Sequence, residues 1–240
     1  MKDILLLPTY NERENVKMII PEIFSLIPEI VVMVIDDNSP DGTAQAVQEL
    51  MTIYPRLRIL KREKKTGLGN AYKEAMRLVM AEDGVRSVIT MDADGSHQPK
   101  YLVDFLANIN DYDLIIGSRY IRGGGVENWE FWRRCLSRFG NIYSKILTGL
   151  PINDFTAGFM CVKVDFLKQL DLVSAGASGY SFLIELKFNL IHNLKARVKE
   201  VPIIFKVRRE GESKLSNSII GEGIMTPLRI CSRRIWQNKK

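Results

Sequence analysis

The stretch SVITMDADGSH, residues 87–97, joins an apolar run to two closely spaced carboxylates. The run through Met91 predicts a β-strand, and Asp92 and Asp94 follow at the point where that strand ends. In open α/β sheets, ligands bind in the crevice beyond the carboxyl ends of the strands. Two carboxylates at that place can hold a divalent cation, Mg²⁺ or Mn²⁺, against the oxygens of a diphosphate. The same pair would also suit a helix cap or a turn, so the rest of the chain has to decide.

Short apolar runs alternate with segments of helical periodicity around this stretch. The predicted strands are residues 4–7, 30–35, 57–60, 88–91 and 114–116, and the predicted helices are residues 15–26, 43–51, 70–80 and 101–109. This alternation predicts an α/β fold, with a largely parallel sheet covered by helices on both faces. Beyond Arg119 the alternation ends, and we expect a helix over 131–147, a strand over 158–164, a helix over 182–194 and a strand over 201–207.

The composition favours a cytoplasmic globular protein. A chain of 240 residues with 46% hydrophobic composition can bury one large core. Its longest apolar run, residues 30–35, is far shorter than the roughly 20 residues that span a bilayer. The three cysteines, Cys135, Cys161 and Cys231, are odd in number and lack metal-ligand spacing, so we expect reduced thiols and no zinc site.

The formal net charge of +6 resides in the last part of the chain, because residues 206–240 hold nine Lys or Arg against three Glu. A basic tail on a neutral body predicts an anionic partner, either a membrane surface or nucleic acid, unless the tail serves only solubility. The tail has no aromatic residue besides Trp236, which disfavours nucleic acid.

We expect a basic amphipathic helix in this tail. Thr226 can cap a helix that has Pro227 at its first position, with Leu228, Cys231 and Ile235 along one face. Such a helix can lie peripherally on the cytoplasmic face of a membrane. The alternative is that its apolar stripe packs on the rest of the chain or on a small membrane subunit.

Polar side chains also follow the first two predicted strands. After the first, Tyr10 can stack on a nucleobase and Glu12 can accept hydrogen bonds from a base or ribose. After the second, Asp37 is a ligand candidate, whereas Asp41 suits a helix cap. His97, beside the acidic pair, is a candidate phosphate contact. The segment GLGNAY, residues 67–72, lacks the third glycine of the dinucleotide fingerprint and follows the third strand, which excludes NAD binding.

Together these motifs resemble the GT-A nucleotide-sugar glycosyltransferases, and in particular the dolichol-phosphate mannosyltransferase family. The matching pieces, in the family's order, are PTYNERENV (8–16), DDNSPDGT (36–43), GLGNAY (67–72), MDADGSHQP (91–99), GSRY (117–120), DFTAGF (154–159) and GESKL (211–215). The resemblance implies a GT-A catalytic domain over residues 1–216, followed by the basic amphipathic tail over residues 217–240. Two positions depart from the family pattern, with Gly95 in place of a bulky apolar residue and Met160 where many relatives carry Arg.

The family's activity, implied by the resemblance, is an inverting, metal-dependent transfer of mannose from GDP-mannose to a dolichyl or polyprenyl phosphate. One alternative enzyme uses UDP-glucose with a polyprenyl phosphate. Another transfers sugar to a polysaccharide hydroxyl, for which Asp154 would be the general base unless it closes a turn. A catalytically silent nucleotide-binding subunit is a third alternative, and the presence of Asp92, Asp94, Arg119 and Arg208 argues against it.

The resemblance also implies site residues. It implies a donor nucleotide-sugar site that contains Pro8, Tyr10, Glu12, Asp37 and Ala93. It implies that Asp92 and Asp94 act on the sugar and the metal-bound diphosphate, with Asp94 and Ser96 as metal ligands. It further implies an acceptor phosphate grip formed by Arg119, Arg133 and Ser137, and a loop closing on the donor diphosphate that carries Arg208 and Lys214.

Overall fold

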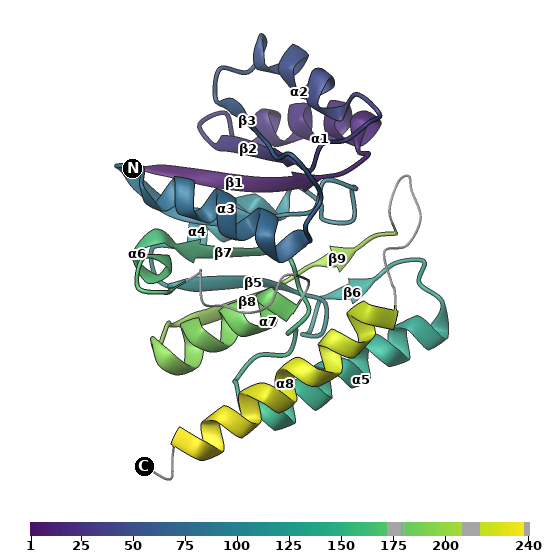
Figure 1. Ribbon diagram of the computed structural model, residues 1–240, viewed down its shortest axis with the longest axis vertical. Helices are drawn as coiled ribbons and strands as arrows, with labels where there is room; N and C mark the ends of the chain where they lie inside the picture. The colour runs from purple at the N-terminus through teal and green to yellow at the C-terminus, as the bar shows by residue number, and fades with distance from the viewer. Residues whose placement is uncertain (172–178, 180, 208–216, 238–240) are drawn as a thin grey trace.

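Seven strands form the central sheet of the computed structural model, which describes residues 1–171, 179, 181–207 and 217–237 (Figure 1). In spatial order they are β3 (Leu57–Lys61), β2 (Val31–Asp36), β1 (Lys2–Thr9), β4 (Val85–Thr90), β7 (Met160–Lys163), β5 (Leu114–Ser118) and β8 (Val198–Pro202). Neighbouring strands run parallel, except that β7 is antiparallel to both β4 and β5. The predicted α/β class and largely parallel sheet are confirmed.

Helices cover both faces of the sheet because its strands are apolar on both sides. On β1, Ile4 and Leu6 point into one core, while Leu5 and Leu7 point into the other. The first core is closed by α3 (Leu68–Met80), α6 (Val164–Leu167) and α7 (Ser181–Phe188), and the second by α1 (Arg13–Leu26), α2 (Thr43–Met51) and α4 (Tyr101–Asn108).

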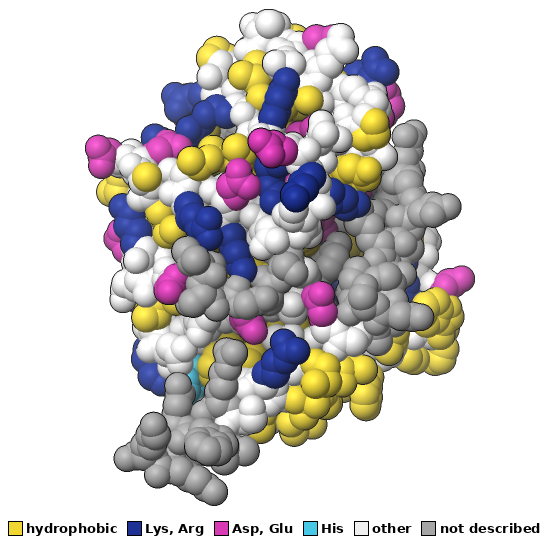
Figure 2. All heavy atoms as spheres, in the orientation of Figure 1, with side chains coloured by type: hydrophobic (Ala, Val, Ile, Leu, Met, Phe, Trp, Pro, Cys, Tyr) yellow, Lys and Arg dark blue, Asp and Glu magenta, His cyan; other side chains and the backbone are white. Residues whose placement is uncertain are grey.

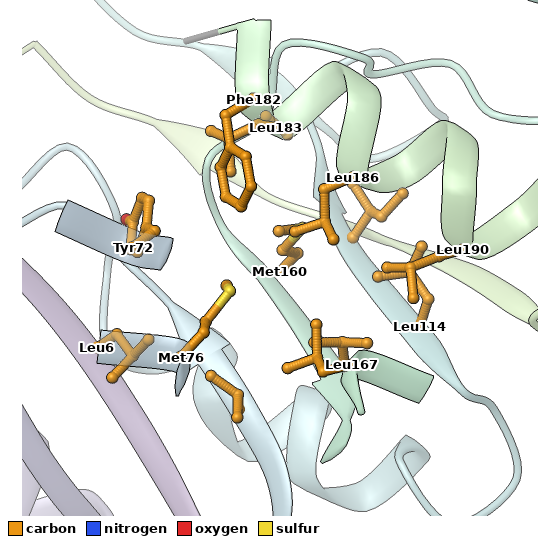
Figure 3. Close-up of a cluster of buried hydrophobic side chains, with 14 of the residues drawn as sticks. Leu6, Tyr72, Met76, Leu114, Met160, Leu167, Phe182, Leu183, Leu186 and Leu190 are labelled. Carbon is orange, nitrogen blue, oxygen red and sulfur yellow. The ribbon is translucent and has the colours of Figure 1, made fainter. Parts of the chain in front are cut away.

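Figure 3 shows how the first core is filled. Tyr72 and Met76 reach from α3 toward Leu167 of α6 and toward Phe182 and Leu186 of α7, across the strand residues between them. Both aromatic rings are at most 1% exposed, which is the close packing expected of a protein interior. The core therefore fixes α7 against the sheet, directly beneath the loops that lead into β7.

The second half of the chain departs from the predicted pattern. The predicted strand over 201–207 is divided between β8 and a short strand β9 (Ile204–Phe205), which pairs with an unpredicted strand β6 (Gly125–Val126). A π-helical turn η1 (Asn189–Asn193) extends α7. Two long helices, α5 (Phe131–Thr148) and α8 (Asn217–Gln237), lie side by side beyond the end of the sheet (Figure 1).

The predicted start of the last helix at Thr226 is wrong. Helix α8 begins at Asn217 and carries Thr226 and Pro227 in its interior. These two residues and Ile230 are buried where α8 packs on α5 and α7, whereas Leu228 is 42% exposed. Tertiary packing thus outweighs the local preference for proline at a helix start. Among the described residues, every helix is too short or too polar to span a bilayer.

The strand order positions the acidic motif. From β1 the chain moves outward through β2 to β3 and then returns to β4 on the other side of β1, so the order reverses between β1 and β4. Ligand crevices form at such a reversal, outside the carboxyl ends of the strands. Because β7 is antiparallel, the loop before it arrives at this same edge. Residues 92–97 therefore share one edge with the loops after β1, β2 and β5 and with residues 154–159.

An ion-pair cluster holds the opposite edge together and predicts acid sensitivity. Asp113 accepts hydrogen bonds from Lys163 Nζ (2.9 Å) and from Arg197 N and Nε (2.9 and 3.1 Å). Although burial raises it, the bonds from Arg197 and Lys163 lower the pKa of Asp113 to about 2. Stability from this lowered pKa is present above the ordinary value near 3.8 and is lost as pH falls toward 2.

We therefore expect Asp113→Asn to lower the free energy of unfolding at pH 7 by about 1–2 kcal/mol, discounted for the solvent-exposed Arg197. The difference from wild type should shrink as pH falls from about 4 to about 2, in urea titrations across that window. Asp111→Asn, which removes an exposed neighbouring carboxylate, serves as the control. An undiminished difference at pH 2 would contradict the assignment.

Candidate functional site

The acidic motif forms a tight turn after β4. The Asp94 Oδ1 atom accepts hydrogen bonds from Ser96 N (3.0 Å) and from Ser96 Oγ (2.5 Å). Between them, Gly95 has a φ of 78°, in the left-handed region that side chains with a Cβ rarely adopt. The glycine that departs from the family pattern therefore suits this turn, which places the Asp94 carboxylate against the Ser96 hydroxyl.

The oxygens of this turn fit a divalent cation that shares its coordination shell with a ligand. Within the described part of the chain, no three or more His, Cys, Asp or Glu side chains gather into a complete metal site. Mg²⁺ is commonly held by one or two carboxylates, with substrate phosphates and waters completing the shell. Asp94 and Ser96 offer hard oxygen donors of that kind, and Asp92 and Asp94 both line the adjoining cavity.

His97 fixes the backbone of the turn. Its Nδ1 accepts a hydrogen bond from Asp92 N (3.0 Å), and its ring packs against Phe159 and Phe205, with centroids 4.9 and 5.2 Å away. Burial lowers the pKa of His97, against the raising effect of Asp92 and Asp94. The imidazole is therefore neutral at pH 7, and its acceptor Nδ1 leaves the proton on Nε2.

The predicted nucleoside-binding residues lie beside this turn, at the ends of β1 and β2. Lys65 Nζ lies 3.8 Å from the centre of the Tyr10 ring, and Glu12 Oε2 accepts a hydrogen bond from Asn15 Nδ2 (2.6 Å). Asp37 forms an ion pair with Arg62. Burial raises the pKa of Asp37, while Arg62 opposes that shift.

The other two donor candidates occupy adjacent strand ends. Pro8 lies near the end of β1, opposite Ile35 of β2, and Ala93 is buried within the acidic turn. The five predicted donor residues thus share the edge of the sheet, but none of them lines the cavity that Asp92 and Asp94 border.

A cavity of about 500 Å³ runs from the acidic turn toward α5 and α8. Asp92, Asp94 and His97 line it, together with Arg119 and Arg133. Apolar and aromatic side chains form much of the remaining wall, among them Leu136, Phe139, Tyr143, Ile184, Val207 and Ile224. One cavity therefore joins carboxylates, guanidinium groups and an apolar wall.

Arg119 is held by a buried carboxylate. Its Nε and Nη2 donate to Asp154 Oδ2 and Oδ1 (both 2.7 Å), its backbone N–H donates to Oδ2 (3.0 Å), and Nη2 also donates to Thr156 Oγ1 (2.6 Å). Although burial raises it, the charge and hydrogen bonds of Arg119 lower the pKa of Asp154 below its ordinary value. Asp154 is fully buried and ionised, and both of its oxygens serve Arg119.

Trp129 contacts the guanidinium groups of both Arg119 and Arg133. The Cζ atoms of Arg119 and Arg133 lie 5.7 and 4.4 Å from the centre of the Trp129 ring, a cation–π arrangement. Four residues after Arg133 on α5, Ser137 Oγ accepts a hydrogen bond from Tyr120 OH (2.6 Å) and also lines the cavity. The structure thus brings the three predicted acceptor residues into one cavity.

Arg208 and Lys214, predicted to act on the donor diphosphate, lie outside the described residues. The chain leading to them is anchored at the acidic turn, because Lys206 N donates to Ser96 O (3.1 Å).

Several residues of the site were missed by the sequence argument. Lys187 is fully buried on α7 and donates to the carbonyl oxygens of Phe155 (2.8 Å) and Ala157 (2.5 Å). Burial lowers the pKa of Lys187 to about 7, although Asp154 opposes the shift. A lysine inside the mostly apolar segment 182–190 was the available signal for Lys187. Thr156 and Asn141 had none, because Thr156 meets Arg119 and Asn141 meets Thr156 only through folding. Trp129 stands four residues before its partner Arg133, but the sequence does not show that both turn toward Arg119.

The matching family model is that of glycosyl transferase family 2, and it covers residues 4–171. The undecaprenyl-phosphate mannosyltransferase of Micrococcus luteus is 38% identical over 237 residues, which cover 99% of this chain and 97% of that protein. The polyprenol monophosphomannose synthase of Mycolicibacterium smegmatis is 40% identical, with coverages of 93% and 84%. The dolichol-phosphate mannosyltransferase of Pyrococcus furiosus is 35% identical, with coverages of 92% and 61%.

Solved structures share the fold. The glucosyl-3-phosphoglycerate synthase of Mycobacterium tuberculosis, in complex with Mn²⁺, UDP and phosphoglyceric acid, superimposes with a TM-score of 0.69 at 17% identity, covering 96% of this chain and 78% of that one. The same enzyme with Mn²⁺ and UDP-glucose gives a TM-score of 0.69 at 18% identity, with coverages of 96% and 79%. The predicted GT-A type of fold is confirmed.

The geometry of the acidic turn predicts cation-dependent nucleotide binding. We expect Asp94→Ala to weaken the binding of a nucleoside diphosphate in Mn²⁺ at least about tenfold, because the cation loses its carboxylate anchor. Calorimetry should give the variant in Mn²⁺ the affinity that wild type has in excess EDTA. Asp111→Asn is the control, since Asp111 is an exposed carboxylate at the opposite edge of the sheet. Wild-type affinity unchanged by EDTA would overturn the metal assignment.

Proposed function

This chain belongs to glycosyl transferase family 2, and we propose that it transfers mannose from GDP-mannose to a polyprenyl or dolichyl phosphate. The chain is a glycosyltransferase, and its relatives at 35–40% identity are named for mannosyl transfer involving undecaprenyl phosphate, polyprenol and dolichol phosphate. The predicted family resemblance is confirmed by them. The choice of GDP-mannose over UDP-glucose follows these relatives, whereas the structural neighbours bind UDP.

The observation that carries the acceptor assignment is the composition of the cavity. Arg119 and Arg133 lie near one tryptophan ring at the end of the cavity that Asp92 and Asp94 line, and the wall beyond them is largely apolar. Guanidinium groups recognise phosphate, while an apolar wall suits a hydrocarbon chain. An acceptor that combines a phosphate with a prenyl chain satisfies both parts.

The chemistry requires little acid–base help. A phosphate monoester is an anion near neutral pH, so its oxygen can attack the anomeric carbon without first losing a proton to the enzyme. The new bond joins that oxygen to the anomeric carbon as the bond to the diphosphate breaks, and GDP leaves. Attack opposite the leaving group inverts the anomeric centre, so that an α-linked donor gives a β-linked product. A divalent cation at Asp94 and Ser96 would neutralise charge on the departing diphosphate.

Asp154 is poorly suited to the alternative, transfer to a hydroxyl. That reaction needs a general base within reach of the attacking oxygen. Both oxygens of Asp154 accept hydrogen bonds from Arg119, its pKa is lowered, and it does not line the cavity. Its contacts instead support a role in holding the phosphate-binding arginine.

Helix α5 presents an apolar face away from the protein. Its inward stripe is polar, with Asn141, Ser144 and Thr148 buried. Four large apolar residues of the same helix, Phe131, Trp132, Ile142 and Ile146, are exposed and do not line the cavity, whereas the exposed Leu136 and Phe139 line it. An ordinary surface helix has the reverse arrangement. Figure 2 shows hydrophobic side chains gathered along the part of the surface where Figure 1 places α5 and α8.

We take this face to contact a membrane surface. The acceptor cavity extends to α5 and α8, so a prenyl chain leaving the cavity would meet the same apolar surface. Exposed basic residues on the two helices, Arg134, Arg138, Lys145 and Arg229, suit the anionic lipids of a cytoplasmic leaflet. The membrane contact therefore involves α5 as well as the basic tail proposed from the sequence.

The function is tested with a panel of donors and acceptors. Purified protein should transfer mannose from GDP-mannose to a polyprenyl phosphate at least about tenfold faster than glucose from UDP-glucose, as expected for a discriminating site. The free polyprenol, which lacks the phosphate, should be inactive. A faster reaction with UDP-glucose would contradict the proposed donor, and transfer to a free hydroxyl would contradict the proposed acceptor class.

The membrane face is tested by vesicle sedimentation. We expect the double variant Ile142→Ser/Ile146→Ser to reduce binding to anionic phospholipid vesicles about tenfold, since two partly inserted apolar side chains are lost. The matched control is Ile53→Ser/Leu78→Ser, which removes exposed apolar side chains from other surfaces. Wild-type protein that stays in the supernatant would point to a membrane subunit as the occupant of this face.

A further inference from the structure

We propose that Asn141 is a positioning residue, which sets the spacing between the two arginines that bind the acceptor phosphate. This inference rests on the proposed function. Arg119 and Arg133 belong to different parts of the fold, one at the end of β5 and the other on α5. A phosphate bound between them requires that these parts keep a fixed distance. Asn141 is a buried residue of α5 that joins them, in addition to the hydrogen bond from Tyr120 OH to Ser137 Oγ (2.6 Å).

The side chain of Asn141 binds the loop before β7 and its own helix together. Its Oδ1 accepts hydrogen bonds from Phe155 N (2.6 Å) and Thr156 N (3.3 Å). Its Nδ2 donates to Ser137 O (2.8 Å) and to Thr156 Oγ1 (3.3 Å). The residue is 3% exposed, so each of these groups would lose its partner out of reach of bulk water.

Thr156 connects Asn141 to the first arginine. Its Oγ1 accepts hydrogen bonds from both Arg119 Nη2 (2.6 Å) and Asn141 Nδ2 (3.3 Å). On the helix side, Asn141 binds the carbonyl of Ser137, which lies one turn after Arg133. A short chain of hydrogen bonds therefore runs from one guanidinium to the helical turn that carries the other.

The remaining anchors of the loop belong to different elements. Glu200 of β8 accepts hydrogen bonds from Asn153 N (3.0 Å) and Asp154 N (3.1 Å), and Lys187 of α7 binds the carbonyl of Phe155 (2.8 Å). These contacts hold the loop to the sheet and to α7, whereas the buried Asn141 and the exposed Lys145, which donates to Asn153 Oδ1 (2.8 Å), hold it to α5. Loss of Asn141 should thus displace α5 relative to the loop and leave Arg119 with Asp154.

The effect should fall on the acceptor alone. The proposed donor side is carried by β1, β2 and β4, whereas the hydrogen bonds of Asn141 lead to Ser137, Phe155 and Thr156. Hydrogen bonds from Arg to phosphate depend on geometry, so a shift between the two guanidinium groups weakens phosphate binding. If Asn141 acts by positioning, replacing it weakens phosphate binding only while Arg133 is present. A general loss of stability would instead weaken binding with or without Arg133.

The experiment is a double-mutant cycle read by binding. Calorimetry with a short-chain prenyl phosphate should show that Asn141→Leu raises Kd about tenfold, while the Kd of GDP with Mn²⁺ stays within about twofold. In an Arg133→Ala background, Asn141→Leu should change the prenyl-phosphate Kd by no more than about twofold, because no spacing is left to set. In the transfer assay, KM for the acceptor should rise more than kcat falls.

Two further variants control for stability. Thr148→Val alters another buried polar residue of α5, whose hydroxyl donates to Ser144 O (2.7 Å) within its own helix, and should leave the acceptor Kd unchanged. Thr156→Val is nearly isosteric and removes the bridging oxygen, so it should reproduce the effect of Asn141→Leu if the latter fails to fold. Equal effects of Asn141→Leu in both backgrounds, or an unchanged Kd, would overturn the proposal. Wild type that binds prenyl phosphate without transferring mannose would overturn the function alone.

Discussion

The buried pair of Arg119 and Asp154 is the interaction on which the acceptor side of the site depends. A buried charge is tolerated only when it is paired and hydrogen-bonded. Asp154 meets that condition for Arg119 with bonds to Nε, Nη2 and the backbone N–H. The loop that carries Asp154 is in turn held by Glu200 and Lys187. The arginine is therefore placed before any ligand arrives, so that little binding energy is lost in ordering it.

The proposed donor and acceptor residues come from two different sets of strands. The donor candidates follow the parallel strands β1, β2 and β4, where the strand order reverses. The acceptor candidates come from β5, from α5 and from the loop that enters the antiparallel strand β7. The turn at Asp92 and Asp94 borders both sets.

Sequence patterns predicted the elements that depend on interactions between residues close together in the chain. Alternating apolar and helical segments predicted the strands through β5 with small differences at their ends, and placed Asp92 and Asp94 after one of them. The second half of the chain was harder to predict from sequence, because β7 is four residues long and its direction depends on the neighbouring strands. Periodicity detects an amphipathic helix but cannot tell which face is turned inward. Helix α5 buries its polar stripe, and Asn141 acquires its importance only from loop residues brought to it by folding.

The outward-facing apolar side of α5 also favours self-association of the purified protein in lipid-free solution. Without lipid, its apolar face meets water, and two molecules can cover each other there at a gain of about 25 cal/mol per Å² of apolar area. Self-association is then set by protein concentration and opposed by detergent micelles, which compete for the same surface. Oligomers seen in lipid-free buffer would for this reason describe the solvent as much as the enzyme, and mild detergent is the medium in which its native monomer or assembly can be measured.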